Sequence, residues 1–155
     1  MIDPVIVLDS TTLIILLDLK QINFLSNLFE KVYIPSVVYK EISVKKEIHL
    51  PPFMEVVEVE HTTDFKLLNR LLDTGESEAI LLAKKMELGL IIDEKKGRKI
   101  AVNYGVKIIG LLGIVYLNIK KGYITEESAK AFLDEALIHS YKINKGLIAE
   151  MFKSL

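Results

Sequence analysis

Two acidic residues stand directly after apolar runs that have the character of buried strands. Asp9 follows Val5–Leu8, and Asp93 follows Leu90–Ile92. Continuous apolar runs rich in β-branched residues are typical of strands covered on both faces, as in parallel sheets. The working site of such a sheet lies beyond the carboxyl ends of its strands, where the strand order reverses. If these two strands are neighbours at that point, the two carboxylates converge.

Two glutamates lie on predicted helices, beside apolar residues that face the core. Glu41 comes three residues after Val38, and Glu78 precedes Leu81 and Leu82 by three and four residues. Residues at these spacings share one face of a helix. A carboxylate next to the core is costly to bury unless it is paired, hydrogen-bonded or bound to a metal. We therefore expect both glutamates to share one pocket with the two aspartates, at the carboxyl edge of the sheet.

This set of donors favours a hard divalent cation. Carboxylate oxygens without cysteine or histidine are typical ligands of Mg²⁺ or Mn²⁺, and the chain contains no cysteine. We interpret the three histidines as structural or solvated; they are His49, His61 and His139. No glycine-rich phosphate loop is present. A phosphatase of the haloacid-dehalogenase type needs a second aspartate where Thr11 stands, and a receiver domain needs paired acids after its first strand, so both are disfavoured.

Each acid also has a purely structural explanation. Asp9 and Asp93 could cap the helices that follow them, a role worth about 1 kcal/mol. Glu41 could pair with Lys45 one helical turn later for about 0.3–0.5 kcal/mol, and Glu78 could gain from the dipole of its helix. Four such roles at once are a less economical explanation than one shared site. The remaining acids we interpret as a helix cap, Glu76, or as solvated, Asp18, Glu94 and Asp134.

Extended runs alternate with helical patterns along the chain. The predicted strands are Val5–Leu8, Val32–Ile34, Val56–Glu60, Leu90–Ile92 and Val106–Ile109. The predicted helices are Thr11–Leu19, Ile22–Phe29, Pro35–Lys46, Asp64–Leu72, a helix with a capping box that runs from Asp73 to about Glu87 and is closed by Gly89, Lys95–Asn103, Leu111–Lys120, Glu126–Leu137 and Lys145–Leu155. This alternation predicts a three-layer α/β/α fold with a five-stranded parallel sheet and extra C-terminal helices. The apolar stretch Leu111–Leu117 could serve as a homodimer surface or as a buried core helix.

Composition indicates one ordinary globular domain, residues 1–155. The chain has a formal net charge of -1 and 50% hydrophobic residues, and a chain of this length needs neither disulfides nor a structural metal to hold a core. Its longest nearly uninterrupted apolar run, Ile108–Leu117, is far shorter than the ~20 residues that cross a bilayer. The first residues lack the basic start of a signal peptide. We expect no membrane segment and a cytoplasmic location.

Four short motifs, taken in order, resemble those of a known family. They are Val7-Leu8-Asp9-Ser10-Thr11, Val38-Tyr39-Lys40-Glu41-Ile42, Gly75-Glu76-Ser77-Glu78-Ala79-Ile80 and Ile92-Asp93-Glu94-Lys95-Lys96-Gly97-Arg98. The chain resembles a PIN domain, and most of all the prokaryotic PIN-like proteins related to the VapC-type toxins. The resemblance continues through Gly110 and Gly113 to the last helix, so it covers nearly the whole chain.

The resemblance implies a sheet of five parallel strands and four acids that bind one or two divalent metals. The family's acids correspond, in order, to Asp9, Glu41, Glu78 and Asp93. Thr11 matches the hydroxyl residue that commonly supports the first acid. Two positions depart from the family pattern: Glu78 stands where many members carry Asp, and Lys96 stands where a further acid is common.

The function implied by the resemblance is a Mg²⁺- or Mn²⁺-dependent endoribonuclease that hydrolyses RNA phosphodiester bonds, acting as the toxin of a toxin–antitoxin pair. Its partners would be RNA, single-stranded or tRNA-like, and an antitoxin protein. Because four carboxylates repel phosphate, we expect cations at the rim of the site to contact the RNA phosphates. The candidates are Lys95, Lys96, Arg98 and Lys99. The alternative is a non-catalytic PIN-like domain that binds RNA or a protein, which the Lys96 departure favours.

Overall fold

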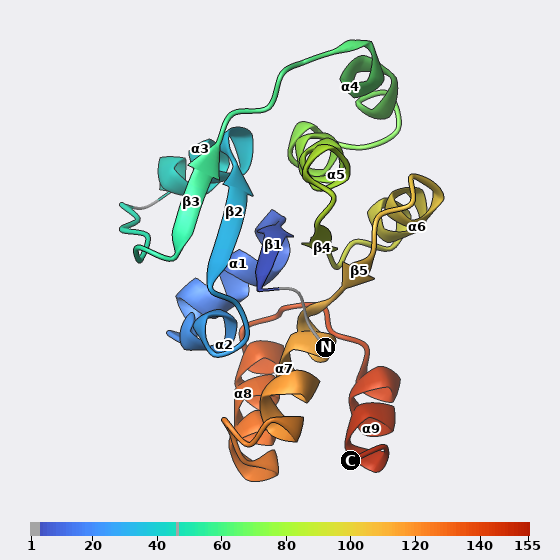
Figure 1. The fold of residues 1–155 in the computed structure, drawn as a ribbon. Coiled ribbons are helices and arrows are strands. Elements are labelled where there is room, and N and C mark those ends of the chain that lie inside the picture. The colour runs from blue at the N-terminus through green and yellow to red at the C-terminus, as the bar shows by residue number, and fades with distance from the viewer. Residues whose placement is uncertain (1–3, 46) are drawn as a thin grey trace.

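The computed structural model describes residues 4–45 and 47–155 and is built around one parallel sheet. The strands are β1 (Val5–Leu8), β2 (Lys31–Pro35), β3 (Met54–Val57), β4 (Gly89–Ile91) and β5 (Ile108–Ile109). They lie in the order β3-β2-β1-β4-β5 (Figure 1). The predicted fold class is therefore confirmed. Strands β2 and β3 lie on one side of β1, and β4 and β5 lie on the other. The strand order therefore reverses between β1 and β4.

Helices connect the strands and then continue past the sheet. Those before the last strand are α1 (Ser10–Asp18), α2 (Asn23–Ser26), α3 (Ser36–Lys45), α4 (Thr63–Leu68), α5 (Thr74–Met86) and α6 (Lys95–Asn103). Those after it are α7 (Leu111–Lys120), α8 (Glu126–Ile138) and α9 (Lys145–Lys153), the extra C-terminal helices that the sequence predicted. Lys46, the predicted end of the third helix, lies outside the described residues.

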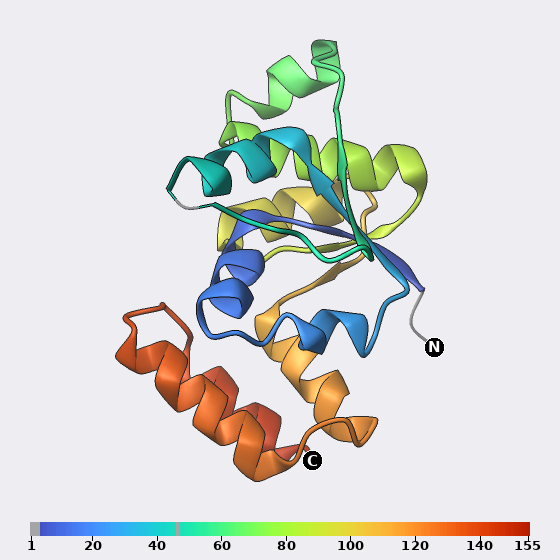
Figure 2. The same cartoon turned by 90° about the vertical axis from the view of Figure 1, so that its left-hand side faces the viewer.

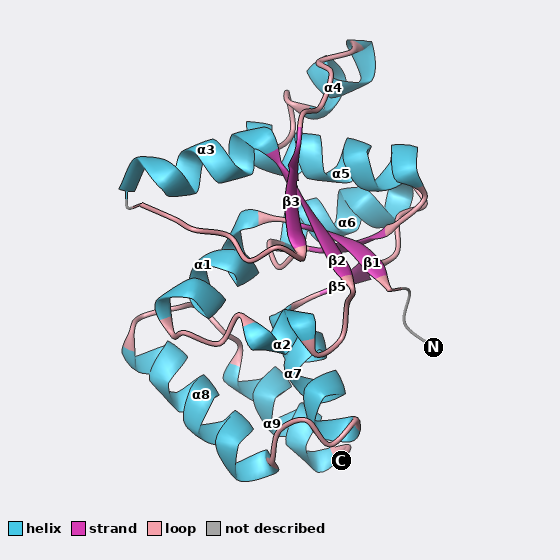
Figure 3. Ribbon diagram, turned by 60° about the vertical axis from the view of Figure 1, so that its left-hand side comes forward, coloured by secondary structure: helices cyan, strands magenta, loops and turns pink. Residues whose placement is uncertain are grey.

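The sheet is covered on both faces, which explains the unbroken apolar character of its central strands. Successive strand residues point to opposite faces. Ile6 and Leu8 of β1 belong to the apolar cluster with α1, α2, α7 and α8, whereas Val7 belongs to the cluster with α4, α5 and α6. All three are 6% exposed or less. Figures 2 and 3 show α5 and α6 on one side of the sheet and α1, α2, α7 and α8 on the other.

The third strand and the residue that closes α5 differ from the prediction, whereas the predicted end of that helix, at about Glu87, is confirmed. The third strand is Met54–Val57 rather than Val56–Glu60, because pairing with β2 places Met54 beside Val32 and Val57 beside Pro35. The helix α5 is closed by Glu87 rather than by Gly89. Glu87 takes the left-handed conformation, with φ 56°, while Gly89 is already paired with Ile6 of β1. The left-handed residue thus comes two positions earlier, because the chain must enter β4 at once.

The helix α7 packs into the core along one side. Leu111, Ile114 and Val115 are 2% exposed or less, so these residues follow the buried alternative for the apolar stretch Leu111–Leu117. Within the part of the chain that the structure describes, no helix has the length and apolar character needed to cross a membrane.

Candidate functional site

Asp9 and Asp93 lie at the ends of adjacent strands. β1 and β4 are paired with Leu8 opposite Ile91, and the Asp9 N–H donates to the Ile91 carbonyl at 3.0 Å. Asp93 comes two residues after Ile91 along the chain. The reversal of strand order therefore brings both carboxylates to the same edge of the sheet.

Asp9 is a buried carboxylate without a full set of partners. It is 3% exposed, and its Oδ1 has no hydrogen-bond partner among the described residues. Although Asp9 stands at the cap position of α1, its side chain makes no capping hydrogen bond, so the cap explanation is wrong for this residue. Burial is the main cause that raises the pKa of Asp9 to about 7, against a lowering by the Ser10 N–H. Nearby negative charges raise this pKa too, those of Asp73, Asp93 and Glu41.

Asp93 is held by donors from two helices. Its Oδ1 accepts a hydrogen bond from the Leu111 N–H at 2.8 Å, and its Oδ2 accepts a short one from the Thr12 hydroxyl. The cap of α6 is Glu94, not Asp93. The hydroxyl that contacts Asp93 belongs to Thr12, which is buried, whereas Thr11 is exposed.

Gly110 allows a close approach between Asp93 and Arg98. A Cβ atom at position 110 would lie 2.9 Å from Asp93 Oδ1 and 2.5 Å from Arg98 Nη1, so a side chain there would displace these groups from their present positions. The Arg98 guanidinium is fixed there by a hydrogen bond from Nη1 to the Ile92 carbonyl at 3.2 Å. A guanidinium is thus positioned beside a site acid, where it can receive a phosphate.

Glu41 lies near a further acid, Asp73, that the sequence indicated only as a helix cap. The Asp73 carboxylate does cap α5. A Cβ atom built at Gly75 would lie 3.6 Å from Asp73 Oδ1 and 3.7 Å from Glu41 Oε2, so these oxygens flank the glycine. Burial, and then the charges of Asp73 and Glu78, raise the pKa of Glu41. No ion pair joins Glu41 to Lys45 in the described structure. The cap of a crossover helix lies at the carboxyl edge of a parallel sheet, and this signal could have identified Asp73.

Glu78 is buried and already has two partners. Its Oε2 lies 2.6 Å from His61 Nε2, and its Oε1 accepts a hydrogen bond from the Val37 N–H at 3.3 Å. The His61 ring stacks on Phe65, with the ring centres 3.7 Å apart. His61, which we had interpreted as structural or solvated, therefore contacts a predicted site acid. Nothing in the sequence indicates this contact, because the two residues are 17 positions apart on different elements.

Replacing His61 with Ala is expected to lower the free energy of unfolding by about 1–3 kcal/mol, because a buried acceptor on Glu78 loses its partner. Urea unfolding measures this change. His139→Ala is the matched control: His139 is exposed and lies 3.9 Å from Glu135, so its loss should cost no more than about 0.5 kcal/mol. Equal losses of stability in the two variants would contradict a stabilising contact between His61 and Glu78.

Glu76 and Glu94 join the starts of α5 and α6. Glu76 completes the predicted capping box with Asp73. Its Oε2 has no donor among the described residues, but both Glu76 Oε2 and Glu94 Oε2 lie within 3.3 Å of a Cβ built at Gly97. Burial, then the charge of Asp73 and the neighbouring Glu94 carboxyl group, raise the pKa of Glu76 to about 8. Burial raises the pKa of Glu94, but hydrogen bonds from the N–H groups of Gly97 and Lys96 outweigh burial and hold this pKa below its ordinary value. Glu94 is exposed, as expected, and it also caps α6.

Replacing Glu76 with Gln is expected to stabilise the protein relative to the parent at about pH 9 but not at about pH 5. A carboxyl group whose pKa is higher in the folded than in the unfolded chain makes the fold lose stability as the pH rises from 4.5 to about 8. Glutamine cannot ionise, so that loss disappears. Melting temperatures across this range in EDTA test the prediction, with the exposed Glu127→Gln as control. If the melting temperatures of the parent and of Glu76→Gln change with pH in parallel, the prediction is contradicted.

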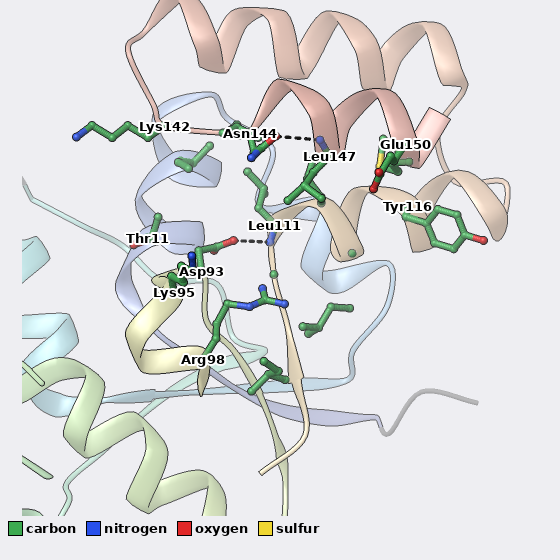
Figure 4. Close-up of a pocket in the computed structure, with 18 of the residues that line it drawn as sticks. Thr11, Asp93, Lys95, Arg98, Leu111, Tyr116, Lys142, Asn144, Leu147 and Glu150 are labelled. Atoms are coloured by element: carbon green, nitrogen blue, oxygen red, sulfur yellow. Dashed lines mark hydrogen bonds between the residues drawn. The ribbon is translucent and has the colours of Figure 1, made fainter. Parts of the chain in front are cut away.

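A large cavity opens beside Asp93, with a volume of about 1010 Å³. Figure 4 shows Asp93, Thr11, Lys95 and Arg98 at one end of this cavity. Of the four predicted site acids, Asp93 is the one that lines it. The charges of Asp93 and Glu41 act on the pKa of Asp9, and the charge of Glu78 acts on the pKa of Glu41.

Comparison with known proteins agrees with this geometry. The sequence profile of a family described as a PIN domain matches residues 5–155. The chain belongs to the PIN-domain family. Proteins with a PIN domain are generally nucleases that use divalent metals. No curated protein matches the chain.

The acids of this PIN domain have suitable chemistry for a divalent cation but are not yet arranged around one. The donors are carboxylate oxygens, and Asp9 Oδ1 is buried without a partner. Across residues 4–45 and 47–155, however, no three acidic or histidine side chains converge on one position that could hold a metal ion. Binding would therefore need side chains to rotate, and Glu41 is exposed enough to do so.

The four cations predicted to contact RNA phosphates divide into two pairs. Lys95 and Arg98 line the cavity beside Asp93. Lys96 and Lys99 are exposed and lie outside its lining. A phosphate held next to Asp93 would therefore lie closer to Lys95 and Arg98 than to Lys96 and Lys99.

Proposed function

We propose that this PIN domain is an endoribonuclease that depends on Mg²⁺ or Mn²⁺ and hydrolyses RNA phosphodiester bonds. The observation that carries the proposal is the buried, unpartnered Oδ1 of Asp9, in a residue whose pKa is raised to about 7 among other carboxylates. A structural role would supply such an oxygen with a donor. A cation-binding role explains why the chain supplies none.

The proposed ligands are Asp9, Glu41, Glu78 and Asp93. Asp9 would be central, because its pKa responds to the charges of both Asp93 and Glu41. Glu78 would join the set only by turning away from His61. The chemistry that a bound cation supplies is activation of water for attack on phosphorus and neutralisation of the charge that develops there.

The other residues would position the substrate. Arg98, fixed on the Ile92 carbonyl, has further N–H groups that can donate to a phosphate. Lys95 is next to it in the cavity lining. Lys96 and Lys99 would contact phosphates farther from Asp93. The Leu111 N–H and the Thr12 hydroxyl orient Asp93 by occupying one lone pair on each of its oxygens.

A second candidate is a PIN domain that binds RNA without cutting it. The observation that favours it is that both Asp93 and Glu78 already have protein donors, so fewer oxygens are available to a metal. The toxin role implied by the resemblance belongs to the first candidate and would place the protein in the cytoplasm with an antitoxin partner. A neighbouring gene for a small DNA-binding protein would support that role.

The experiment that separates the two candidates is incubation of the purified protein with structured and single-stranded RNA, in Mn²⁺ or in EDTA. The endoribonuclease gives internal fragments in Mn²⁺ alone. Binding without fragments in both conditions supports the second candidate.

A further inference from the structure

The cavity beside Asp93 is larger than the chemistry of phosphate hydrolysis requires. It runs from the ends of β4 and β5 along α7 to the C-terminal helix α9. Its volume, about 1010 Å³, is at the upper end of the roughly 300–1,000 Å³ of small-molecule pockets. Of the proposed metal ligands, Asp93 alone lines it, so most of its wall has no role in the function proposed above.

One end of the cavity is cationic. Lys95 and Arg98 come from α6, and Lys142 comes from the segment before α9. Figure 4 shows Lys95 and Arg98 beside Asp93, and Lys142 on the α9 side of the cavity with its side chain extending away from Asp93. Arg98 needs no rearrangement to bind an anion, because its guanidinium is already fixed. This end can hold a phosphate.

The other end is mainly apolar and is walled by α7 and α9. Its apolar lining includes Ile109, Leu112, Leu147 and Met151. Leu147 is 52% exposed although it is a large apolar residue, so it presents apolar surface to whatever enters. Asn144 stands between the two ends. Its Oδ1 caps α9 through the Leu147 N–H at 3.1 Å, which leaves its amide NH₂ group to donate to a ligand.

We propose that this cavity binds the nucleotide adjacent to the scissile phosphate, with its phosphate at the cationic end and its base at the apolar end. The inference rests on the proposed function for the identity of the substrate. A nucleotide has an anionic phosphate and a flat, largely apolar base. With increasing distance from Asp93, the cavity offers first a cationic surface for the phosphate and then an apolar surface for the base. The helix α9 then becomes the element that selects the nucleotide, through Leu147 and Asn144.

An apolar protein segment would be the competing occupant. It would fill the end beside Leu147 equally well, but it would offer no anionic group to Lys95, Arg98 and Lys142. The charge at the Asp93 end therefore favours a nucleotide.

Binding of a fluorescein-labelled single-stranded RNA, measured by anisotropy in EDTA, tests the inference without cleavage. Lys142→Ala is expected to weaken binding and to reduce the slope of log K against log salt by about 0.7, the loss of one phosphate contact. Leu147→Ala is expected to weaken binding about fivefold at unchanged slope, because it removes apolar contact only. The matched controls are Lys130→Ala and Val102→Ala, exposed residues on α8 and α6 outside the cavity lining. Both controls should bind as the parent does.

The outcomes separate the inference from the proposed function. Metal-dependent cleavage together with unchanged binding by both cavity variants would overturn the inference and leave the function standing. Selective weakening in both variants, with no cleavage in Mn²⁺, would support the cavity as an RNA site and reject the nuclease. Absence of RNA binding by the parent would overturn the inference and favour a protein segment as occupant.

Discussion

Replacing Asp9 with Asn is expected to lower the rate of Mn²⁺-dependent RNA cleavage by at least about 100-fold. Substitution of residues that merely support a metal ligand commonly costs 10–100-fold in affinity or activity, so loss of the central ligand should cost at least as much. Asparagine has nearly the shape of aspartate but lacks its charge. The measurement is the initial cleavage rate of a labelled RNA at several Mn²⁺ concentrations.

The matched control for cleavage is Asp64→Asn. Asp64 is an exposed acid in the first turn of α4, so this change removes one charge without touching the proposed site. It should cleave as the parent does. If Asp9→Asn cleaves as fast as Asp64→Asn, with both variants folded by circular dichroism, the cleavage belongs to a contaminant or to another site.

Excess Mn²⁺ is expected to raise the melting temperature of the parent protein by about 5–10 °C. A ligand that binds only the folded state stabilises it by about 2.7 kcal/mol at a hundredfold excess over Kd, and each kcal/mol is worth about 2–4 °C for a domain of this size. Asp9→Asn should respond far less. Thermal melts in EDTA and in Mn²⁺ measure both effects.

In EDTA the same substitution should stabilise the protein near pH 7.5, by on the order of 2 kcal/mol. The pKa of Asp9 is about 7 when folded against 3.8 for the free side chain, so the folded state binds more protons. The parent therefore loses stability as the pH rises from about 4 to about 7, and Asp9→Asn loses less. A helix cap predicts the opposite, because its removal costs stability with or without metal. Destabilisation of Asp9→Asn in EDTA, with no Mn²⁺ response in the parent, would reject the metal site.

The sequence predicted those site residues whose positions follow from strand ends. Asp9 and Asp93 come directly after apolar runs, and a parallel sheet with its reversal between β1 and β4 places both at one edge. This argument needs only the hydrophobic pattern and a right-handed crossover.

Residues that act through side-chain direction could not be predicted in this way. Thr12 rather than Thr11 contacts Asp93, because the rotation of α1 relative to the sheet decides which hydroxyl is buried. His61 reaches Glu78 from an extended segment whose path depends on tertiary packing. Glu94 and not Asp93 caps α6, since the helix begins one residue later than the strand end suggests. Each of these differences is a shift of one residue or a contact between distant elements.

The lengths of the outermost strands bear on how another protein could bind. Exposed sheet edges invite β-strand addition from other chains. Here the edges are β3, with four residues, and β5, with two. The first is preceded by Pro51 and Pro52 and carries the exposed Glu55. Such short edges offer an incoming strand few backbone groups to pair with. We therefore expect any protein partner to recognise this chain through side chains on its helices rather than by extending its sheet.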